Sequence, residues 1–433
     1  MRPLLAFALL VLLTACESAK LPVEAAMGPN PRIVEPNHTL IPTVRIAPAK
    51  GWTNGAMPRA ASGLAVNAFA TGLEHPRFLY VLPDGDVLVA ESSAPPKKEK
   101  PKGIRAWFMA RLMKKAGAAV PSANRISLLR DADGDGVAET HTAFLRDLFS
   151  PYGIALVGND LYVANADAVV RFPYRDGITE ITGAGTRLAE LPGGPINHHW
   201  TKSLIASRDG SKLYAGVGSN SNVAESGMAV EANRAAILEI DRATGAARVF
   251  ASGLRNPVGL AWNPETGALW TSVNERDELG SDLVPDYMTS VRDGGFYGWP
   301  YSYYGQHVDA RVQPPRPDLV AAALVPDYAL GAHTASLGLA FYDGRMFPPH
   351  FANGAFVGQH GSWNRRPLSG YKVIFVPFAA GRPSGPAEDV LTGFVDDDGN
   401  AHGRPVGVAV DRRGALLVAD DVGNVVWRVS ARE

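Results

Sequence analysis

The chain has 433 residues, of which 46% are hydrophobic, and its 42 basic side chains are balanced by 43 acidic ones. Such a balance provides no general electrostatic attraction for nucleic acid, so we expect no nucleic-acid partner. The single cysteine, Cys16, excludes an intrachain disulfide and a catalytic thiol in the mature domain.

The N-terminus has the features of an export signal. Arg2 precedes an apolar run over residues 4–13 that is too short to span a bilayer, which predicts a signal peptide over residues 1–15. The run ends in Leu-Thr-Ala-Cys, which is similar to a bacterial lipobox, where cleavage leaves Cys16 lipidated. The alternative is an ordinary secretory signal with a chance cysteine. Glu17 resembles the residue that favours the outer membrane in proteobacterial lipoproteins, so we expect a lipid-anchored cell-envelope protein that faces the periplasm.

Residues 16–60 are rich in Pro, Ala and Asn and show little periodicity. This composition predicts a lipidated tether between the anchor and the folded domain. Residues 61–433 are then left for one domain.

A short phrase recurs six times in this domain: a Pro or polar residue, an apolar run, a turn with Gly or Asp, and a second apolar run. Each copy predicts a β-hairpin. The copies span residues 76–90, 151–164, 202–216, 257–272, 337–358 and 405–419. Radial repetition of one hairpin predicts an all-β, six-bladed propeller with long inter-blade loops, in which each blade packs mainly on its neighbours.

One inter-blade segment is unusually basic, because residues 97–115 contain eight Lys or Arg and one Glu. Residues 104–118 could form a basic amphipathic helix that lies on a membrane or a partner. The alternative is a helix that caps one end of the propeller and turns its lysines to water.

An acidic loop follows this segment. Asp131, Asp133 and Asp135 are spaced two apart and Gly136 follows, as in oxygen-rich calcium loops. The EF-hand form fails, because its twelfth position is Thr142. The loop therefore predicts either a structural Ca²⁺ site or a hairpin turn that uses Asp and Gly for their backbone freedom.

Polar residues gather where the third and fourth hairpins begin. His198 and His199 precede the third hairpin and offer a general base, a fragment of a zinc site or a structural pair. Arg255 and Asn256 precede the fourth, and a guanidinium suits an anionic or carbonyl-rich ligand. The acidic turn over residues 274–282 could hold a hard cation.

The order of these motifs resembles the glucose/sorbosone dehydrogenase family, most closely its sorbosone-dehydrogenase-like branch, over roughly residues 73–429. The motifs are His-Trp-Thr-Lys at 199–202, Gly-Leu-Arg-Asn-Pro-Val-Gly-Leu at 253–260, Asn-Glu-Arg-Asp-Glu at 274–278, Tyr-Gly-Trp-Pro at 297–300, Gly-Gln-His-Gly-Ser-Trp-Asn-Arg at 358–365 and Gly-Arg-Pro-Val at 403–406. The resemblance implies a six-bladed propeller that oxidises an aldose or sugar aldehyde with pyrroloquinoline quinone (PQQ) and Ca²⁺.

The resemblance also implies roles for single residues. His199 corresponds to the base, Arg255 to the group that stabilises the developing oxyanion, and Asn256 to a cofactor contact. Main-chain carbonyls of Asp277 and Glu278 correspond to Ca²⁺ ligands. Further cofactor contacts correspond to Arg404, His360 and Arg365.

The chain departs from the family at two cofactor positions. A second arginine for the cofactor carboxylates falls on Val406, and residues 359–365 stand where the glucose-oxidising branch uses a lysine. Electrons would leave for an acceptor such as a cytochrome or a quinone, and the basic segment is a candidate docking surface. Two other functions would suit the same fold: a Ca²⁺-dependent sugar lactonase and a non-catalytic propeller that binds an envelope partner.

Overall fold

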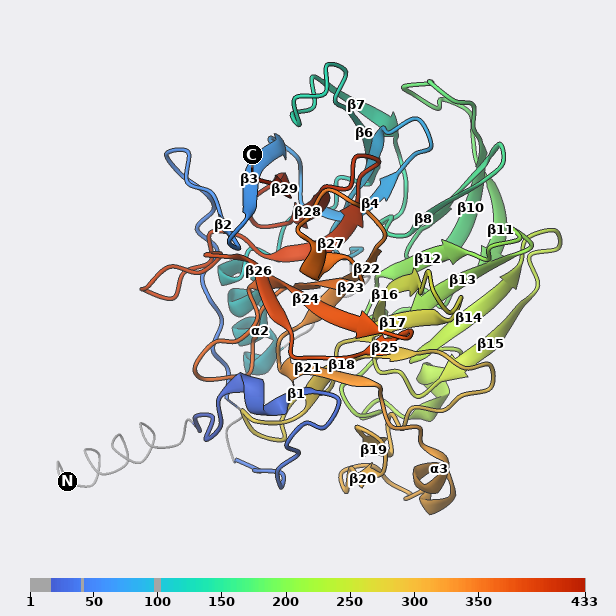
Figure 1. Ribbon diagram of the computed structural model, residues 1–433. Coiled ribbons are helices and arrows are strands. Elements are labelled where there is room, and N and C mark those ends of the chain that lie inside the picture. The colour runs from blue at the N-terminus through green and yellow to red at the C-terminus, as the bar shows by residue number, and fades with distance from the viewer. Residues whose placement is uncertain (1–16, 40–42, 97–102, 433) are drawn as a thin grey trace.

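The computed structural model describes residues 17–39, 43–96 and 103–432. Its strands form six antiparallel sheets arranged in a ring, which confirms the expected six-bladed propeller (Figure 1). The predicted signal peptide and the lipidation site Cys16 lie outside the described residues.

Each of the first three blades has four strands in chain order from the axis outward. Blade 1 contains β4 (Pro76–Val81), β5 (Val87–Glu91), β6 (Arg125–Arg130) and β7 (Thr140–Leu145). Blade 2 contains β8 (Ile154–Val157), β9 (Asp160–Ala164), β10 (Ala168–Pro173) and β11 (Thr186–Glu190). Blade 3 contains β12 (Lys202–Ala206), β13 (Lys212–Val217), β14 (Ala236–Asp241) and β15 (Ala247–Ser252).

The last three blades each include a strand from the N-terminal part of the chain. Blade 4 contains β16 (Pro257–Trp262), β17 (Leu269–Val273), β18 (Pro285–Ser290), β21 (Tyr328–Ala332) and β1 (Met27–Gly28). Blade 5 contains β22 (Ser336–Tyr342), β23 (Gly354–Gln359), β24 (Lys372–Ala379), β25 (Arg382–Pro383), β26 (Glu388–Thr392) and β2 (Arg59–Ala60). Blade 6 contains β27 (Pro405–Val410), β28 (Leu416–Asp420), β29 (Val425–Ala431) and β3 (Leu64–Ala70).

The remaining elements lie in the loops. A ribbon of β19 (Ser302–Tyr303) and β20 (His307–Val308) stands beside α3 (Pro317–Ala322) as an excursion from blade 4 (Figure 1). The other helices are α2 (Ile104–Lys115) and three short 3₁₀ turns, η1 (Val23–Ala26), η2 (Met228–Glu231) and η3 (Pro349–Phe351). Among the described residues, no helix combines the length and the apolar composition needed to cross a membrane.

All six expected hairpins are confirmed as the two innermost strands of their blades. The glycine within the repeated phrase explains how these strands approach one another around the axis. A Cβ on Gly338 would lie 2.4 Å from the Val406 carbonyl oxygen, and one on Gly407 would lie 2.5 Å from the Arg77 carbonyl oxygen. Only glycine therefore permits the inner strands of neighbouring blades to meet backbone to backbone.

The hydrophobic core is divided among the blade interfaces. In the described residues, six clusters of buried side chains are each shared by two neighbouring blades, and a seventh closes the central channel with Tyr152, Val258, Leu337 and Val406. This division is why a domain of this length needs no single large core.

Residues 17–39 and 43–60 are docked on the propeller, whereas their composition predicted a tether. Asp282 accepts hydrogen bonds from the backbone N–H groups of Lys20 and Leu21, and the Arg45 N–H donates to the Trp363 carbonyl. The segment also contributes β1 and β2 to blades 4 and 5. Its apolar residues lack the alternation of a strand, so the sequence did not indicate this docking, which joins backbone contacts to the packing of side chains such as Ala47 and Trp52 in the core.

Candidate active site

The polar residues of interest lie on one face of the propeller, where each innermost strand begins and the second strand ends. Antiparallel pairing explains their proximity: Lys202 is opposite Val217, Ser336 opposite Gln359, and Pro405 opposite Asp420. Residues just before an inner strand therefore meet residues just after its partner. The sequence prediction had used only the first of these two positions.

His199 is held with one ring nitrogen fixed and the other left for chemistry. Its Nδ1 lies 2.7 Å from the Ser219 carbonyl oxygen, and since a carbonyl can only accept, Nδ1 carries the proton in the neutral ring. Burial, reinforced by Arg255 and His198, lowers the pKa of His199 well below its ordinary value. The imidazole is thus neutral near pH 7, and Nε2 has the lone pair of a general base.

Lys202 holds the turn that carries His199. It is fully buried, and its Nζ donates to the His199 and Trp200 carbonyls and to Asn197 Oδ1, at 3.0–3.3 Å. Burial lowers the pKa of Lys202 well below its ordinary value. We conclude that this lysine positions the base rather than meeting a ligand.

Asn256 lies beside His199, since a Cβ on Gly218 would contact both the Asn256 Oδ1 and the His199 Cβ. Asn256 is 6% exposed, and its Oδ1 has no hydrogen-bond partner among the described residues. An unsatisfied buried acceptor is costly, so this atom points to a ligand donor in the working protein.

Arg255 differs from its predicted role as an oxyanion stabiliser. Its guanidinium donates to the Glu275 carbonyl at 2.7 Å, to Asn222 Oδ1 at 3.0 Å and to the Asn222 carbonyl at 3.3 Å, and it is 3% exposed. Because these contacts occupy its donors, Arg255 acts as a brace between two loops, and it also keeps positive charge near His199.

The expected calcium position does not fit the donors around it. The Asp277 carbonyl accepts hydrogen bonds from Asn222 Nδ2 at 3.1 Å and from the Arg311 guanidinium at 3.0 Å. Both lone pairs of this oxygen are therefore in use, and the nearby guanidinium would repel a cation. We accordingly assign no Ca²⁺ to the Asp277–Glu278 turn.

The Asp277 carboxylate instead links blades 4 and 5. Its Oδ1 lies 3.3 Å from His333 Nδ1, and its Oδ2 lies 3.6 Å from the Arg255 guanidinium. Burial alone would raise the pKa of Asp277, but His333 and Arg255 lower it to about 2. The carboxylate is therefore ionised throughout the physiological range.

On the other side of the channel, Asp421 organises a second polar cluster. Its carboxylate forms an ion pair with Arg77, lies 2.9 Å from His360 Nε2 and 3.6 Å from His75 Nε2. Burial would raise the pKa of Asp421, but these neighbours hold it below its ordinary value. Burial lowers the pKa of His360 to about 4, so this histidine is neutral near pH 7.

The two predicted cofactor arginines are differently placed. Arg404 is 1% exposed, donates to the Ala47 carbonyl at 3.0 Å and lies 4.9 Å from the Tyr371 ring centre, so the N-terminal segment covers it. Arg365 donates to the Leu21 and Pro367 carbonyls. The prediction that Arg365 contacts the cofactor is therefore corrected, because its guanidinium binds the N-terminal segment instead.

Trp200 joins the two halves of this face. The Arg77 guanidinium carbon lies 5.9 Å from the Trp200 ring centre, and Trp200 is the chain neighbour of His199. Arg77, Trp200 and Asp421 were absent from the predicted site. The register of the repeated phrase could have identified Arg77, because its position in blade 1 corresponds to Val406 in blade 6.

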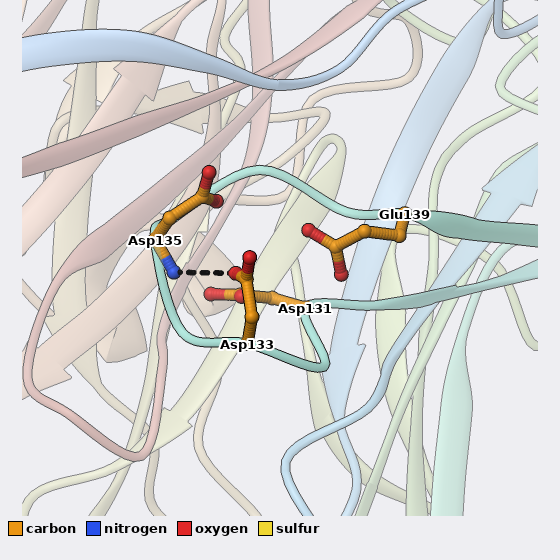
Figure 2. Close-up of side chains that lie close together, drawn as sticks. All are labelled: Asp131, Asp133, Asp135 and Glu139. Atoms are coloured by element: carbon orange, nitrogen blue, oxygen red, sulfur yellow. Dashed lines mark hydrogen bonds between the residues drawn. The ribbon is translucent and has the colours of Figure 1, made fainter.

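The acidic loop is formed as expected, and Figure 2 shows its four carboxylates turned toward one another. One ligand oxygen from each of Asp131, Asp133, Asp135 and Glu139 lies within 4.8 Å of the others. Asp131 also accepts the Gly134 and Gly136 N–H groups and lies 3.4 Å from the Arg413 guanidinium. The turn conformation is thus present, and a structural Ca²⁺ stays a prediction.

Two cavities accompany these clusters. The larger, about 410 Å³, lies in the channel beyond the apolar closure and is lined by apolar side chains of the inner strands, such as Phe78, Trp262 and Phe341. The smaller, about 200 Å³, lies under the N-terminal segment between Glu17 and Arg311. Catalytic groups line neither, so His199 and Asn256 define the candidate site.

Comparison with known proteins gives a family match over part of the chain. Residues 159–362 match the family model described as glucose/sorbosone dehydrogenase, and residues 320–432 match a TrAA12-like model. An uncharacterised protein of Borreliella burgdorferi is 29% identical over 300 residues, which is 66% of this chain and 76% of that protein. The aldose sugar dehydrogenase YliI of Escherichia coli is 31% identical over 103 residues, 24% of this chain and 26% of that protein.

Solved structures share the fold. The holo form of the pyranose dehydrogenase PQQ domain of Coprinopsis cinerea has a TM-score of 0.68 at 22% identity and covers 89% of this chain and 100% of that chain. A calcium structure of the Trichoderma reesei family AA12 protein has a TM-score of 0.70 at 19% identity and covers 90% and 99%. Residues 159–362 thus match a glucose/sorbosone dehydrogenase domain, and the six-bladed ring is the fold shared with these solved structures.

Proposed function

We propose that this protein is a PQQ-dependent dehydrogenase that oxidises an aldose or a sugar aldehyde such as sorbosone. The observation that carries the proposal is the neutral His199, whose Nδ1 is fixed on the Ser219 carbonyl beside the unsatisfied Asn256 Oδ1. The match of residues 159–362 to the glucose/sorbosone dehydrogenase model and the likeness in fold to a pyranose dehydrogenase support the choice of reaction.

The residues present fit the cofactor. PQQ is a planar quinone with three carboxylates, so its site should provide cations, hydrogen-bonding groups and a ring surface. Arg77 and Arg404 provide the cations, and Trp200 provides the ring surface. The Nε atoms of both arginines have no hydrogen-bond partner among the described residues. When bound, PQQ supplies the acceptor for a hydride, that is, for two electrons.

The protein's own part in the reaction is proton transfer and orientation. His199 Nε2 accepts the proton of the substrate hydroxyl, or of the hydrate when the substrate is an aldehyde. Ser219 and Lys202 hold the imidazole in the required tautomer and position. No step is assigned to Ca²⁺, because the Asp277 carbonyl already accepts two hydrogen bonds.

The proposal includes a place of action. Lipidation at Cys16 would fix the enzyme to the bacterial envelope, with its catalytic domain in the periplasm, where a cytochrome or quinone would take the electrons. The signal-like residues 1–15 and the lipobox-like residues 13–16 support this part.

The direct test is reconstitution. Purified apo-protein is mixed with PQQ, with and without Ca²⁺, and cofactor absorbance and dye reduction are followed with a panel of aldoses and sugar aldehydes. His199→Gln should keep PQQ binding but lower kcat by ~10²- to 10⁴-fold, as expected for loss of a general base. His350→Gln, at a half-exposed histidine paired with Glu388, should match the wild type.

Absence of both the absorbance change and the dye reduction would defeat the proposal. Turnover of sugar lactones in their place would support the lactonase instead. Nothing at the site favours that alternative, because Asp277 and Asp421 are each paired with His and Arg rather than turned toward an open cation position.

A further inference from the structure

The position that lacks the family's second arginine has no room for one. Val406 is fully buried and packs with Tyr152, Val258 and Leu337 in the cluster that closes the channel. Its own backbone carbonyl faces Gly338. A guanidinium here would lie in the apolar cluster that closes the channel, without hydrogen-bond acceptors. The replacement of the family's arginine by Val406 is therefore part of how the channel is closed.

The same register in the neighbouring blade carries an arginine. His75-Pro76-Arg77 opens β4 as Arg404-Pro405-Val406 opens β27, and both strands have a register shift directly after the proline. The two strands are also in contact, because a Cβ on Gly407 would lie 2.5 Å from the Arg77 carbonyl oxygen. Arg77 is thus the next-blade counterpart of Val406.

The surroundings of Arg77 leave it able to bind an anion. Its side chain is 12% exposed, one terminal nitrogen pairs with Asp421, and Nε has no partner among the described residues. Burial lowers the pKa values of His75 and His360, so both imidazoles are neutral near pH 7, and the one carboxylate paired with the Arg77 guanidinium among the described residues is Asp421. Trp200 adds a ring surface 5.9 Å away.

We infer that Arg77 has taken over the role of the missing arginine and binds a carboxylate of PQQ from blade 1. This inference rests on the proposed function. Within the described residues, Arg404 is less accessible than Arg77, because the Ala47 carbonyl and the Tyr371 ring hold its guanidinium under the N-terminal segment.

The test is a binding titration, independent of turnover. Binding of PQQ to the apo-protein is followed by quenching of tryptophan fluorescence. Arg77→Met should raise the Kd by ~10- to 100-fold, as expected for losing a charge-assisted contact, and Arg77→Lys should recover part of the affinity. The matched control is Arg428→Met, which removes an arginine of similar burial (8% exposed, against 12% for Arg77) paired with Asp411 and should leave the Kd unchanged.

A second ligand separates carboxylate binding from a structural role. The trimethyl ester of PQQ lacks the negative charges, so Arg77→Met and wild type should bind it within about twofold of one another, by the same reasoning about charge assistance. Equal losses for acid and ester would mean that Arg77 only supports the fold through Asp421, and would overturn the inference. An unchanged Kd for the acid would overturn it as well. Failure of the wild type to bind PQQ would instead overturn the proposed function, and this inference with it.

Discussion

His199 is suited to act as a base because of its contacts with Ser219 and Lys202 and because of the nearby charge of Arg255. The Ser219 carbonyl selects the tautomer, Lys202 fixes the turn, and burial together with Arg255 keeps the ring neutral. The role of His199 as a base stays a prediction, and the structure adds that its ring partner is a backbone carbonyl, which the residue types in the sequence could not indicate.

The pKa of His199 leads to a prediction about pH. Because protonation abolishes the base, kcat/KM should fall only as the pH drops through this lowered pKa, and should be flat from about 6.5 upward, the ordinary histidine value. A pH profile of kcat/KM on the reconstituted enzyme measures this. An acid limb at or above pH 6.5 would contradict the assignment of a buried, neutral base.

Lys202 gives a second prediction at this scale. Lys202→Met removes three hydrogen bonds that hold residues 197–200, so kcat should fall by ~10-fold or more while the Kd for PQQ changes little. Lys212→Met is the control, because Lys212 forms a partly exposed ion pair with Asp241 away from the site. Equal kcat values for the two variants would show that Lys202 does not position His199.

At the scale of elements, α2 is the part whose role the fold leaves open. The expected helix is confirmed over Ile104–Lys115. Its C-terminal end is held by a hydrogen bond that the Ala49 N–H donates to the Lys115 carbonyl. Toward its N-terminal end Trp107, Phe108 and Met109 are 64%, 49% and 42% exposed. The helix is therefore docked at its C-terminal end, where Lys114 and Lys115 lie, and presents apolar side chains toward its N-terminal end.

We predict that α2 contributes to contact with the electron acceptor. Lys114→Gln combined with Lys115→Gln should slow reduction of a cytochrome acceptor severalfold at low salt, because attraction between charged surfaces sets the association rate. The KM for sugar and the rate with a small neutral dye should stay unchanged. Equal rates of cytochrome reduction by the double variant and the wild type would contradict this hypothesis.

At the scale of the whole molecule, the ring is closed by pairing its two ends. β3, from the N-terminal side of the domain, forms the outer strand of blade 6 beside β29. Phe69 of β3 is 4% exposed and packs in the cluster between blades 6 and 1. Closure therefore also brings Arg77, near the start of the domain, to Asp421, near its end, and so completes the second polar cluster of the site.

Weakening the closure should destabilise the whole domain. Phe69→Ala should lower the free energy of unfolding by ~3–5 kcal/mol, the usual cost of deleting a buried aromatic ring. Phe149→Ala, at a side chain that is 40% exposed, should cost much less. Urea unfolding followed by tryptophan fluorescence compares the two, and similar midpoints would refute a special role for the closing strand.

The sequence by itself determined the six hairpins and the fold, because strand alternation and turn residues are local properties, and it placed His199 and Asn256 where inner strands begin; their roles stay predictions. Only the tertiary structure decided which groups meet: Asp421 with Arg77 and His360, Arg311 on the Asp277 carbonyl, and Arg365 on the N-terminal segment. These contacts join residues tens to hundreds of positions apart, so they depend on how the blades close into a ring. The same closure buries Val406 and brings Arg77 beside it, which a reading of blade 6 alone could not reveal.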